Sequence, residues 1–460
     1  MSESSHNMPE AVGLAGNEPL DAAIAAYLGA RADTRQRLDA ALAGDPACAM
    51  THCLDGYVSM TSSTREGLER ARAAVRRLRA AGAPSMAPRE AAHVGALEAW
   101  SRGDMRGATR CWDALLAEWP RDLVAIKASQ FVLSYLGESD RMRSTVAGVV
   151  PAWNPGVPGY GFMLGCYAYA LEEAGDYALA EEMGQRAVEL NPADIWAAHA
   201  VAHVREMQGR LREGIQWIST LGGEWQGCGS FARHLRWHEA LYHLELEQYG
   251  RVLELYDRDV HAAASDEYLD LANAASLLWR LEQADVDVGQ RWRALAEQAR
   301  AHVGDHSLVF VDLHYLMALA AVGDDGAIEH FLTSCDRFVA AGRGTEAEVM
   351  KSVGVPLAQA VVAHRRRAFD EVVDRLIPVR RRLHLIGGSR AQRDVFEQLL
   401  IDAAVRSRRF DVAAMLLGER TLGRPGNRWG WRHHAAVLDA LGAPGAMEAH
   451  RELDRLRAHG

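Results

Sequence analysis

The sequence predicts an all-α protein, an α-solenoid or superhelix of about ten stacked helical hairpins between residues 35 and 458. Good helix formers, mainly Ala, Leu, Glu and Arg, dominate the long segments. Short glycine-containing turns recur with a period near 34 residues. No sustained alternation of β-branched residues indicates a strand. Because one hairpin cannot bury its apolar face alone, stacked neighbours are expected to close a continuous core around a concave wall.

The clearest repeat covers residues 170–192. A Gly-Asp-Tyr turn at 175–177 ends a first helix, a small residue three positions later lets the second helix pack closely, and Pro192 ends the unit. The same pattern of a turn glycine followed by a small residue returns at Gly209, 34 residues after Gly175, and at Gly214. This pattern resembles the tetratricopeptide repeat and implies paired antiparallel helices.

Breaks in the helical pattern suggest four parts. Residues 1–34 form an N-terminal segment that we expect to be partly disordered. Hairpins resembling tetratricopeptide repeats are expected over 35–156, which ends in a Pro/Gly-rich loop. Central repeats over 157–345 carry a group of histidines, and further hairpins with a terminal cap occupy 346–460.

Net charge, hydropathy and cysteine content limit the kinds of partner and compartment that we expect. The formal net charge of −10 argues against a nucleic acid or an anionic membrane surface. No segment approaches the roughly 18 uninterrupted apolar residues of a membrane helix. The six cysteines are scattered without a Cys-x-x-Cys motif, as expected for reduced thiols. We therefore expect a cytoplasmic protein with no nucleic-acid and no membrane partner.

Two histidine pairs are the feature that a plain helical scaffold does not require. His199 and His203 lie four residues apart, with Glu206 on the same helical face, and His234 and His238 repeat the spacing. Residues four apart are neighbours on a helix, so each pair presents two imidazoles side by side. Counting register from the repeat pattern directs the first pair into the concave groove. We expect these side chains to line an open pocket there.

Three interpretations of the histidines remain open. Two imidazole pairs near a carboxylate are a common donor set for a divalent metal such as zinc or iron, although Ala200 rules out the His-Glu-x-x-His protease motif. Without a metal, His203 oriented by Glu206 could act as a general acid or base. Alternatively, the histidines hydrogen-bond across adjacent helices. The metal-ligand candidates are His199, His203, His234 and His238, and the catalytic candidates are His199, His203, Glu206 and His238.

A glycine-rich turn at 387–389 provides a further candidate site. It precedes a helix expected to begin near Ala391, and helix N-termini favour anions. The alternative is an ordinary capping box, with Ser389 as N-cap and Gln392 as the third helical residue. Across the chain, the ligand-binding candidates are His234, Trp237, Asp312, His314, Arg390, Gln392, Arg393 and Asp394.

Longer motifs resemble the tetratricopeptide repeat protein 38 family. They include His-Ala-Val-Ala-His-Val-Arg-Glu-Met at 199–207, Trp-His-Glu-Ala-Leu-Tyr at 237–242 and Phe-Val-Asp-Leu-His-Tyr-Leu-Met at 310–317. The segment Gly-Gly-Ser-Arg-Ala-Gln-Arg-Asp-Val-Phe at 387–396 belongs to the same set. The resemblance extends over nearly the whole chain. It implies an all-helical repeat fold and no particular activity.

Two functional classes are compatible with these observations. The first is a small-molecule binder, or an enzyme of unknown reaction, with its ligand in the groove of the superhelix. The second is a scaffold that binds a peptide along the groove. Concentration of the unusual polar residues in two neighbouring hairpins favours the compact site. A second copy packed on a terminal hairpin would give a homodimer.

Overall fold

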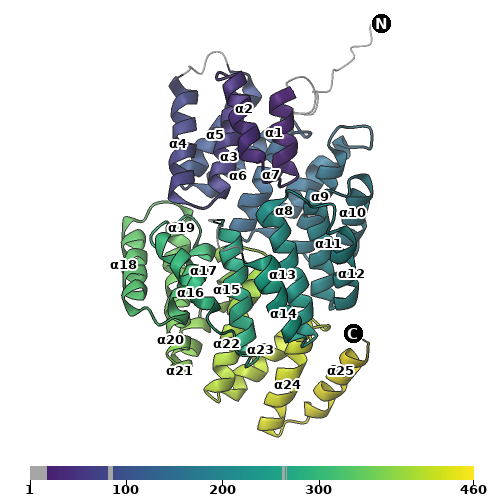
Figure 1. Cartoon of the computed structure of the whole chain (residues 1–460), viewed down its shortest axis with the longest axis vertical. Coiled ribbons are helices and arrows are strands. Elements are labelled where there is room, and N and C mark those ends of the chain that lie inside the picture. Colours follow the sequence, from purple (N-terminus) through teal and green to yellow (C-terminus); the bar gives the residue numbers. More distant parts are fainter. Residues whose placement is uncertain (1–17, 81–85, 262–264, 266, 460) are drawn as a thin grey trace. The chain divides into compact units, whose positions relative to one another are not determined.

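The computed structural model describes residues 18–80, 86–261, 265 and 267–459. These residues form 25 α-helices and contain no strand, which confirms the all-α prediction (Figure 1). Ten hairpins would contain about 20 helices, fewer than the 25 found in the described residues, and one of the 25, residues 18–28, lies ahead of the expected first hairpin. The expected boundaries at 156 and 345 stay predictions.

The described residues form two compact units, and those of the first lie within 18–134, 138–200 and 227–229. Its helices are α1 (Glu18–Leu28), α2 (Thr34–Gly44), α3 (Ala49–Thr61), α4 (Arg65–Ala80), α5 (Pro88–Ser101), α6 (Met105–Glu118), α7 (Leu123–Tyr135), α8 (Ser139–Val149), α9 (Tyr160–Glu173), α10 (Tyr177–Leu190) and the first part of α11 (Ile195–Gln208).

The described residues of the second unit lie within 135–137, 201–226 and 230–459. Besides the rest of α11, its helices are α12 (Leu211–Leu221), α13 (Gly229–Glu245), α14 (Tyr249–Leu255), α15 (Tyr268–Gln283), α16 (Arg291–Ala301), α17 (Val309–Ala321), α18 (Asp325–Ala341), α19 (Thr345–Val349), α20 (Val355–Arg365), α21 (Phe369–Leu376), α22 (Arg390–Arg406), α23 (Phe410–Gly423), α24 (Arg428–Leu441) and α25 (Ala446–His459).

The turn glycines of the repeat pattern lie at helix ends in the structure. Gly175, between α9 and α10, has a positive φ of 88°, a conformation that L side chains rarely adopt. Ala180, the small residue three positions after the tyrosine, is fully buried where the two helices pack. Gly209 likewise adopts φ 71° between α11 and α12. At Gly214 a methyl group would overlap the ring of Tyr242, so α12 and α13 need a glycine at this contact.

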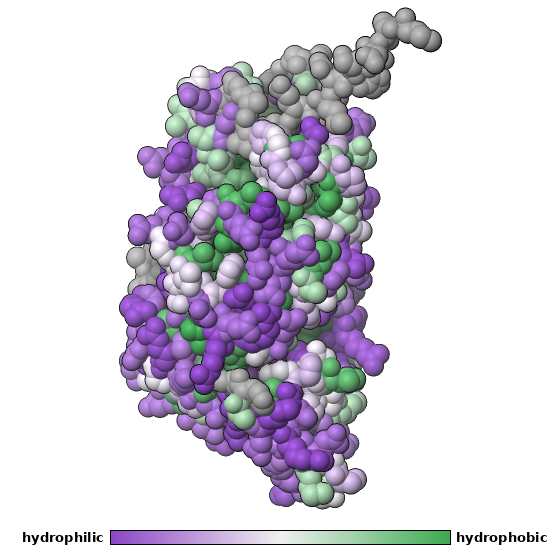
Figure 2. Space-filling view, turned by 90° about the vertical axis from the view of Figure 1, so that its right-hand side faces the viewer, coloured by the Kyte–Doolittle hydropathy of each residue, from purple (hydrophilic) through white to green (hydrophobic). Residues whose placement is uncertain are grey.

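Several helices of the second unit are buried on almost every side. α15 is buried continuously over 270–281 and α17 over 309–320. Such helices form the interior of the unit, and polar groups on them must find partners inside the protein. The outer surface differs, because the face in Figure 2 is largely hydrophilic with hydrophobic residues in small separate patches. Among the described residues, no helix combines the length and hydropathy required to cross a membrane.

Candidate functional site

Three of the four predicted histidines, His203, His234 and His238, meet in the interior. His203 and His238 are fully buried, and His234 and His199 are only 2% and 3% exposed. His203 comes from α11 and the pair His234 and His238 from α13, while His199 precedes His203 by one turn of the same continuous helix. One candidate ligand nitrogen from each of His203, His234 and His238 lies within 4.8 Å of the others. The predicted grouping is therefore found, but the expectation of an open pocket lined by these rings is wrong.

Hydrogen bonds across three helices orient two of the imidazoles. His238 Nδ1 lies 2.8 Å from Glu206 Oε2, and His234 Nδ1 lies 3.1 Å from Oδ1 of Asn273 on α15. The two Nε2 atoms face each other at 3.3 Å. With the Asn273 amide oxygen turned towards His234, each Nδ1 faces an oxygen acceptor and carries the ring hydrogen, and both Nε2 atoms then present lone pairs. Two lone pairs at this separation repel unless a cation or a proton lies between them.

Burial controls the protonation of this group. It lowers the pKa of His234 and of His238 well below the ordinary value, and neighbouring imidazoles add to the effect. Burial raises the pKa of Glu206, which the guanidinium of Arg424 partly offsets. Both histidines are therefore neutral near pH 7, the form in which imidazole binds a metal. The sequence had suggested His203 as the partner of Glu206, whereas the structure places His238 against this carboxylate.

The predicted aromatic residue of the site supports the imidazoles. Trp237 is fully buried, and its ring stacks on His234 with centroids 5.3 Å apart and planes 15° apart. It meets His238 edge-on at 4.8 Å, and its Nε1 donates to Ser276 Oγ at 3.2 Å. The ligand-binding role predicted for Trp237 stays a prediction.

Asp312 and His314, on α17, have other partners. Asp312 Oδ2 accepts from His306 Nδ1 at 3.0 Å. His314 Nδ1 donates to the carbonyl oxygen of Phe310 at 2.7 Å, and its ring packs edge-on against Phe396. Burial lowers the pKa of His314 to about 4. Among the described residues, neither side chain belongs to the metal-compatible group of histidines.

The glycine-rich turn before α22 is a capping box, as the alternative interpretation predicted. Ser389 Oγ accepts from the backbone N–H of Gln392 at 3.3 Å, and Gln392 Oε1 accepts from the backbone N–H of Ser389 at 2.9 Å. Arg393 donates to the carbonyl oxygen of Gly388, and Arg390 is exposed. Gln392 and Arg393 thus serve the start of the helix, and anion binding at this turn stays a prediction.

Asp394 is the centre of a buried ion-pair network that sequence analysis missed. Both of its oxygens accept from Arg420 on α23, at 2.6 and 2.9 Å. Arg424 lies 3.2 Å from Asp394 Oδ1 and 4.0 Å from Glu206 Oε1, so the network reaches the histidines. Gln398 donates to Asp394 Oδ2 at 2.7 Å. The guanidinium of Arg420 holds the pKa of the Asp394 carboxyl well below its usual range despite burial.

Arg280 and Asn273 were also missed, although the sequence carried a signal. Both are polar residues inside the long buried run of α15. The guanidinium of Arg280 donates to the carbonyl oxygens of Ser276, at 3.2 Å, and Ala391, at 2.9 Å. It lies 5.8 Å from the ring centroid of Trp237. Burial lowers the pKa of Arg280 to about 10, which still leaves it cationic near neutral pH.

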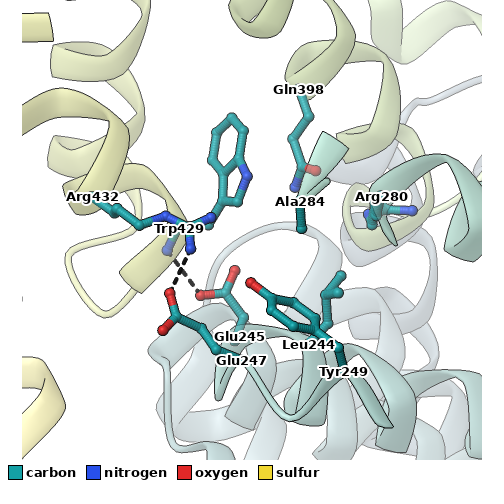
Figure 3. Close-up of a pocket in the computed structure, with 9 residues that line it drawn as sticks. All are labelled: Leu244, Glu245, Glu247, Tyr249, Arg280, Ala284, Gln398, Trp429 and Arg432. Carbon is teal, nitrogen blue, oxygen red and sulfur yellow. Dashed lines mark hydrogen bonds and ion pairs between the residues drawn. The ribbon is translucent and has the colours of Figure 1, made fainter. Parts of the chain in front are cut away.

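A separate cavity lies beside Arg280 (Figure 3). Its empty space is about 370 Å³ including the open mouth. In Figure 3, Trp429 and Gln398 face Tyr249 and Leu244 across the space, and Arg280 is at one end. None of the residues predicted from sequence lines it. The nine lining residues are Leu244, Glu245, Glu247, Tyr249, Arg280, Ala284, Gln398, Trp429 and Arg432.

No family model matches the chain. Among solved structures, the chain is similar to one of Naa15/Naa10 bound to HypK-THB, with 12% identity and a TM-score of 0.25. That match covers 92% of this chain and 65% of the other, so the chain spans about two thirds of its length. A human IFIT1 dimer with m7Gppp-AAAA is 14% identical, with a TM-score of 0.36 and 89% of each chain covered. At these values the matches carry no functional argument.

Proposed function

We propose that this helical-repeat protein binds a divalent transition-metal ion, with zinc favoured, through His203, His234 and His238. Ligation by His199, the other candidate from the sequence, stays a prediction. The ion would lie in the interior of the second unit, and small-molecule binding stays a prediction. The observation that carries the proposal is the 3.3 Å separation of His234 Nε2 and His238 Nε2, with the opposite nitrogen of each ring held by an acceptor.

The separation suits tetrahedral zinc. Zinc–imidazole bonds are about 2.0–2.1 Å, so two nitrogens at a tetrahedral angle lie about 3.3–3.4 Å apart. Glu206 on His238 Nδ1 provides the carboxylate that commonly supports a metal-bound imidazole, and Asn273 supports His234 in the same way. The lowered pKa of both histidines keeps their ligand nitrogens free of protons near pH 7.

Acid–base catalysis is the second candidate function, favoured by the His238–Glu206 contact of 2.8 Å. A carboxylate-oriented imidazole can take up or release a proton at its other nitrogen. The link from Glu206 through Arg424 and Asp394 to Gln398 connects this pair to a residue lining the cavity. Other expectations from the sequence stay predictions. They are an enzymatic reaction, a peptide-binding role without catalysis, the absence of nucleic-acid partners, homodimer formation and a cytoplasmic location.

Elemental analysis tests the metal proposal directly. The protein is purified without a polyhistidine tag, and zinc and iron are quantified per chain. We expect about one equivalent in the unaltered protein and a loss of metal in His234→Gln. His243→Gln is the matched control, because this histidine lies at the end of the same helix and contacts Gln248 instead. Its metal content should not change.

Glu206→Gln tests the metal site without removing a ligand, and therefore serves if a variant of a ligand histidine fails to fold. Loss of a supporting carboxylate typically weakens metal binding about 10–100-fold, measurable by competition with a chromophoric chelator. A well-folded, unaltered protein that contains no metal and takes up none from added zinc would overturn the proposal. That result would favour a turned Asn273 amide that donates to His234 Nδ1, with His234 Nε2–H donating to His238.

A further inference from the structure

We propose that Ser334, His306 and Asp312 form a separate nucleophilic site, in which Ser334 accepts an acyl group from a small activated carboxylic ester. This inference goes beyond the proposed metal function, requires no metal and uses none of the histidines of that site. Asp312 was among the ligand-binding candidates, whereas sequence analysis missed His306 and Ser334. The arrangement is a hydrogen-bonded chain from a hydroxyl through an imidazole to a buried carboxylate.

The three side chains come from adjoining segments of the second unit. Asp312 lies in the first turn of α17 and Ser334 in the middle of α18, and these two helices pack against each other. His306 lies in the loop ahead of α17. Its Nδ1 is 3.0 Å from Asp312 Oδ2, and its Nε2 is 2.8 Å from Ser334 Oγ. Both distances suit the hydrogen bonds that join a nucleophile, its base and the group that orients the base.

The carboxylate fixes the tautomer that general-base catalysis requires. Because Asp312 accepts from Nδ1, this nitrogen carries the ring hydrogen, and Nε2 keeps a lone pair for the hydroxyl hydrogen of Ser334. Asp312 is 2% exposed, and burial raises its pKa, while hydrogen bonds from the ring and backbone of His306 oppose that rise. This carboxylate is the group that would stabilise His306 after its ring takes up a proton.

The ring of His306 is held from several sides. The residue adopts φ 46°, a left-handed backbone conformation that residues other than glycine rarely adopt. Such conformations persist where surrounding contacts determine them, and they are frequent at active sites. Here the imidazole stacks on Phe338, with ring centroids 4.8 Å and planes 20° apart, and Phe331 meets it edge-on at 6.4 Å. The base is therefore positioned against the hydroxyl before any substrate binds.

Access distinguishes this group from a similar one in the first unit. The imidazole of His93 also lies between a hydroxyl and a carboxylate, those of Tyr57 and Asp122, but all three residues are fully buried. Ser334 is only partly buried, so an ester carbonyl can reach its Oγ from solvent. An oxygen that becomes negative at such a position gains less from the protein than in an enclosed site, so the site suits esters whose leaving group departs easily.

The acyl transfer takes two steps. In the first, Ser334 Oγ bonds to the ester carbonyl carbon and its proton passes to His306 Nε2, then the ester C–O bond breaks and the departing oxygen takes that proton. In the second, water attacks the acyl carbon and gives a proton to Nε2, and the bond to Oγ breaks as Oγ recovers the proton. The products are an alcohol or phenol and a carboxylic acid.

Reaction of the full chain with a fluorophosphonate tests the proposal, because this probe labels an activated serine. We expect one label per chain, which peptide mass spectrometry locates at Ser334. Hydrolysis of 4-nitrophenyl acetate gives the turnover. Ser334→Ala should abolish the label, and His306→Gln should slow labelling about 100-fold or more, as expected for the loss of a general base. Asp312→Asn should lower kcat about tenfold or more with little change in KM, because the carboxylate acts through the imidazole and touches no substrate.

Ser219→Ala is the matched control. Ser219 is also a helical serine of the second unit, but its Oγ donates to the carbonyl oxygen of Gln216 in its own helix. Label and turnover should not change in this variant. Labelling of the unaltered protein needs no substitution, so the test stands if His306→Gln or Asp312→Asn unfolds.

Three results would each overturn the proposal. They are a folded, unaltered protein without label at Ser334, equal labelling of Ser219, and unchanged turnover in folded Ser334→Ala. Because metal content is measured separately, failure of this site is distinguishable from failure of the metal site.

Discussion

Replacing Asp394 with asparagine should strongly destabilise the second unit. The substitution removes the negative charge that compensates Arg420, whose side chain is 1% exposed. It also removes the carboxylate nearest to Arg424. Breaking a buried ion pair by removing one partner typically costs about 3–5 kcal/mol, because the remaining charge stays buried. We expect a decrease of that order in the free energy of unfolding for Asp394→Asn.

Glu419→Gln is a closely matched control. Glu419 directly precedes Arg420 on α23 and also forms a two-pronged pair, with Arg380 at 2.5 and 2.9 Å. Its side chain is 50% exposed, however, so water replaces the lost interaction. Exposed pairs contribute about 0–1 kcal/mol. The difference between the two variants therefore isolates the effect of burial on pairs with similar geometry.

Urea denaturation at pH 7, followed by far-ultraviolet circular dichroism and tryptophan fluorescence, provides the measurement. The pKa of Asp394 is lowered in the folded protein, so its contribution is present above the unfolded value of about 3.9 and is lost as pH falls through the folded value. The deficit of Asp394→Asn should accordingly persist at pH 5. A loss no larger than that of Glu419→Gln would refute the assignment of this network to a dry interior.

Two further predictions concern packing and pH. Gly214→Ala should lower the free energy of unfolding by about 1–2 kcal/mol, because overlap of the added methyl group with Tyr242 outweighs the gain in helix propensity. Gly95 has open space around the added methyl group, so Gly95→Ala should raise the free energy of unfolding by up to about 1 kcal/mol. Thermal or urea melts measure both changes. Because the pKa of His314 falls to about 4 on folding, the unfolded chain binds its proton first, and stability should decrease by up to about 3 kcal/mol between pH 6.5 and 4. His314→Gln should show a correspondingly weaker pH dependence in urea titrations, and an unchanged profile would contradict this account.

The features that sequence determined are local in the chain. The Gly-Asp-Tyr turn at 175–177 predicted the break between α9 and α10, because a positive φ and a nearby small residue are properties of a few consecutive positions. The spacing of His199 and His203 placed both on one helical face, since the helix period fixes that relation. The capping box of Ser389 and Gln392 was also readable, because its hydrogen bonds join residues three apart.

Only the tertiary structure decided which distant groups meet and whether water reaches them. Glu206 orients His238, 32 residues away, and Asp394 receives Arg420, 26 residues away, because helix packing brings those faces together. His93 lies between Tyr57 and Asp122, with its Nδ1 3.0 Å from the Tyr57 hydroxyl and its Nε2 2.9 Å from Asp122 Oδ2. Helix periodicity specifies the face on which a residue lies, but the partner and the burial of that face depend on how neighbouring helices cross and on the side chains between them.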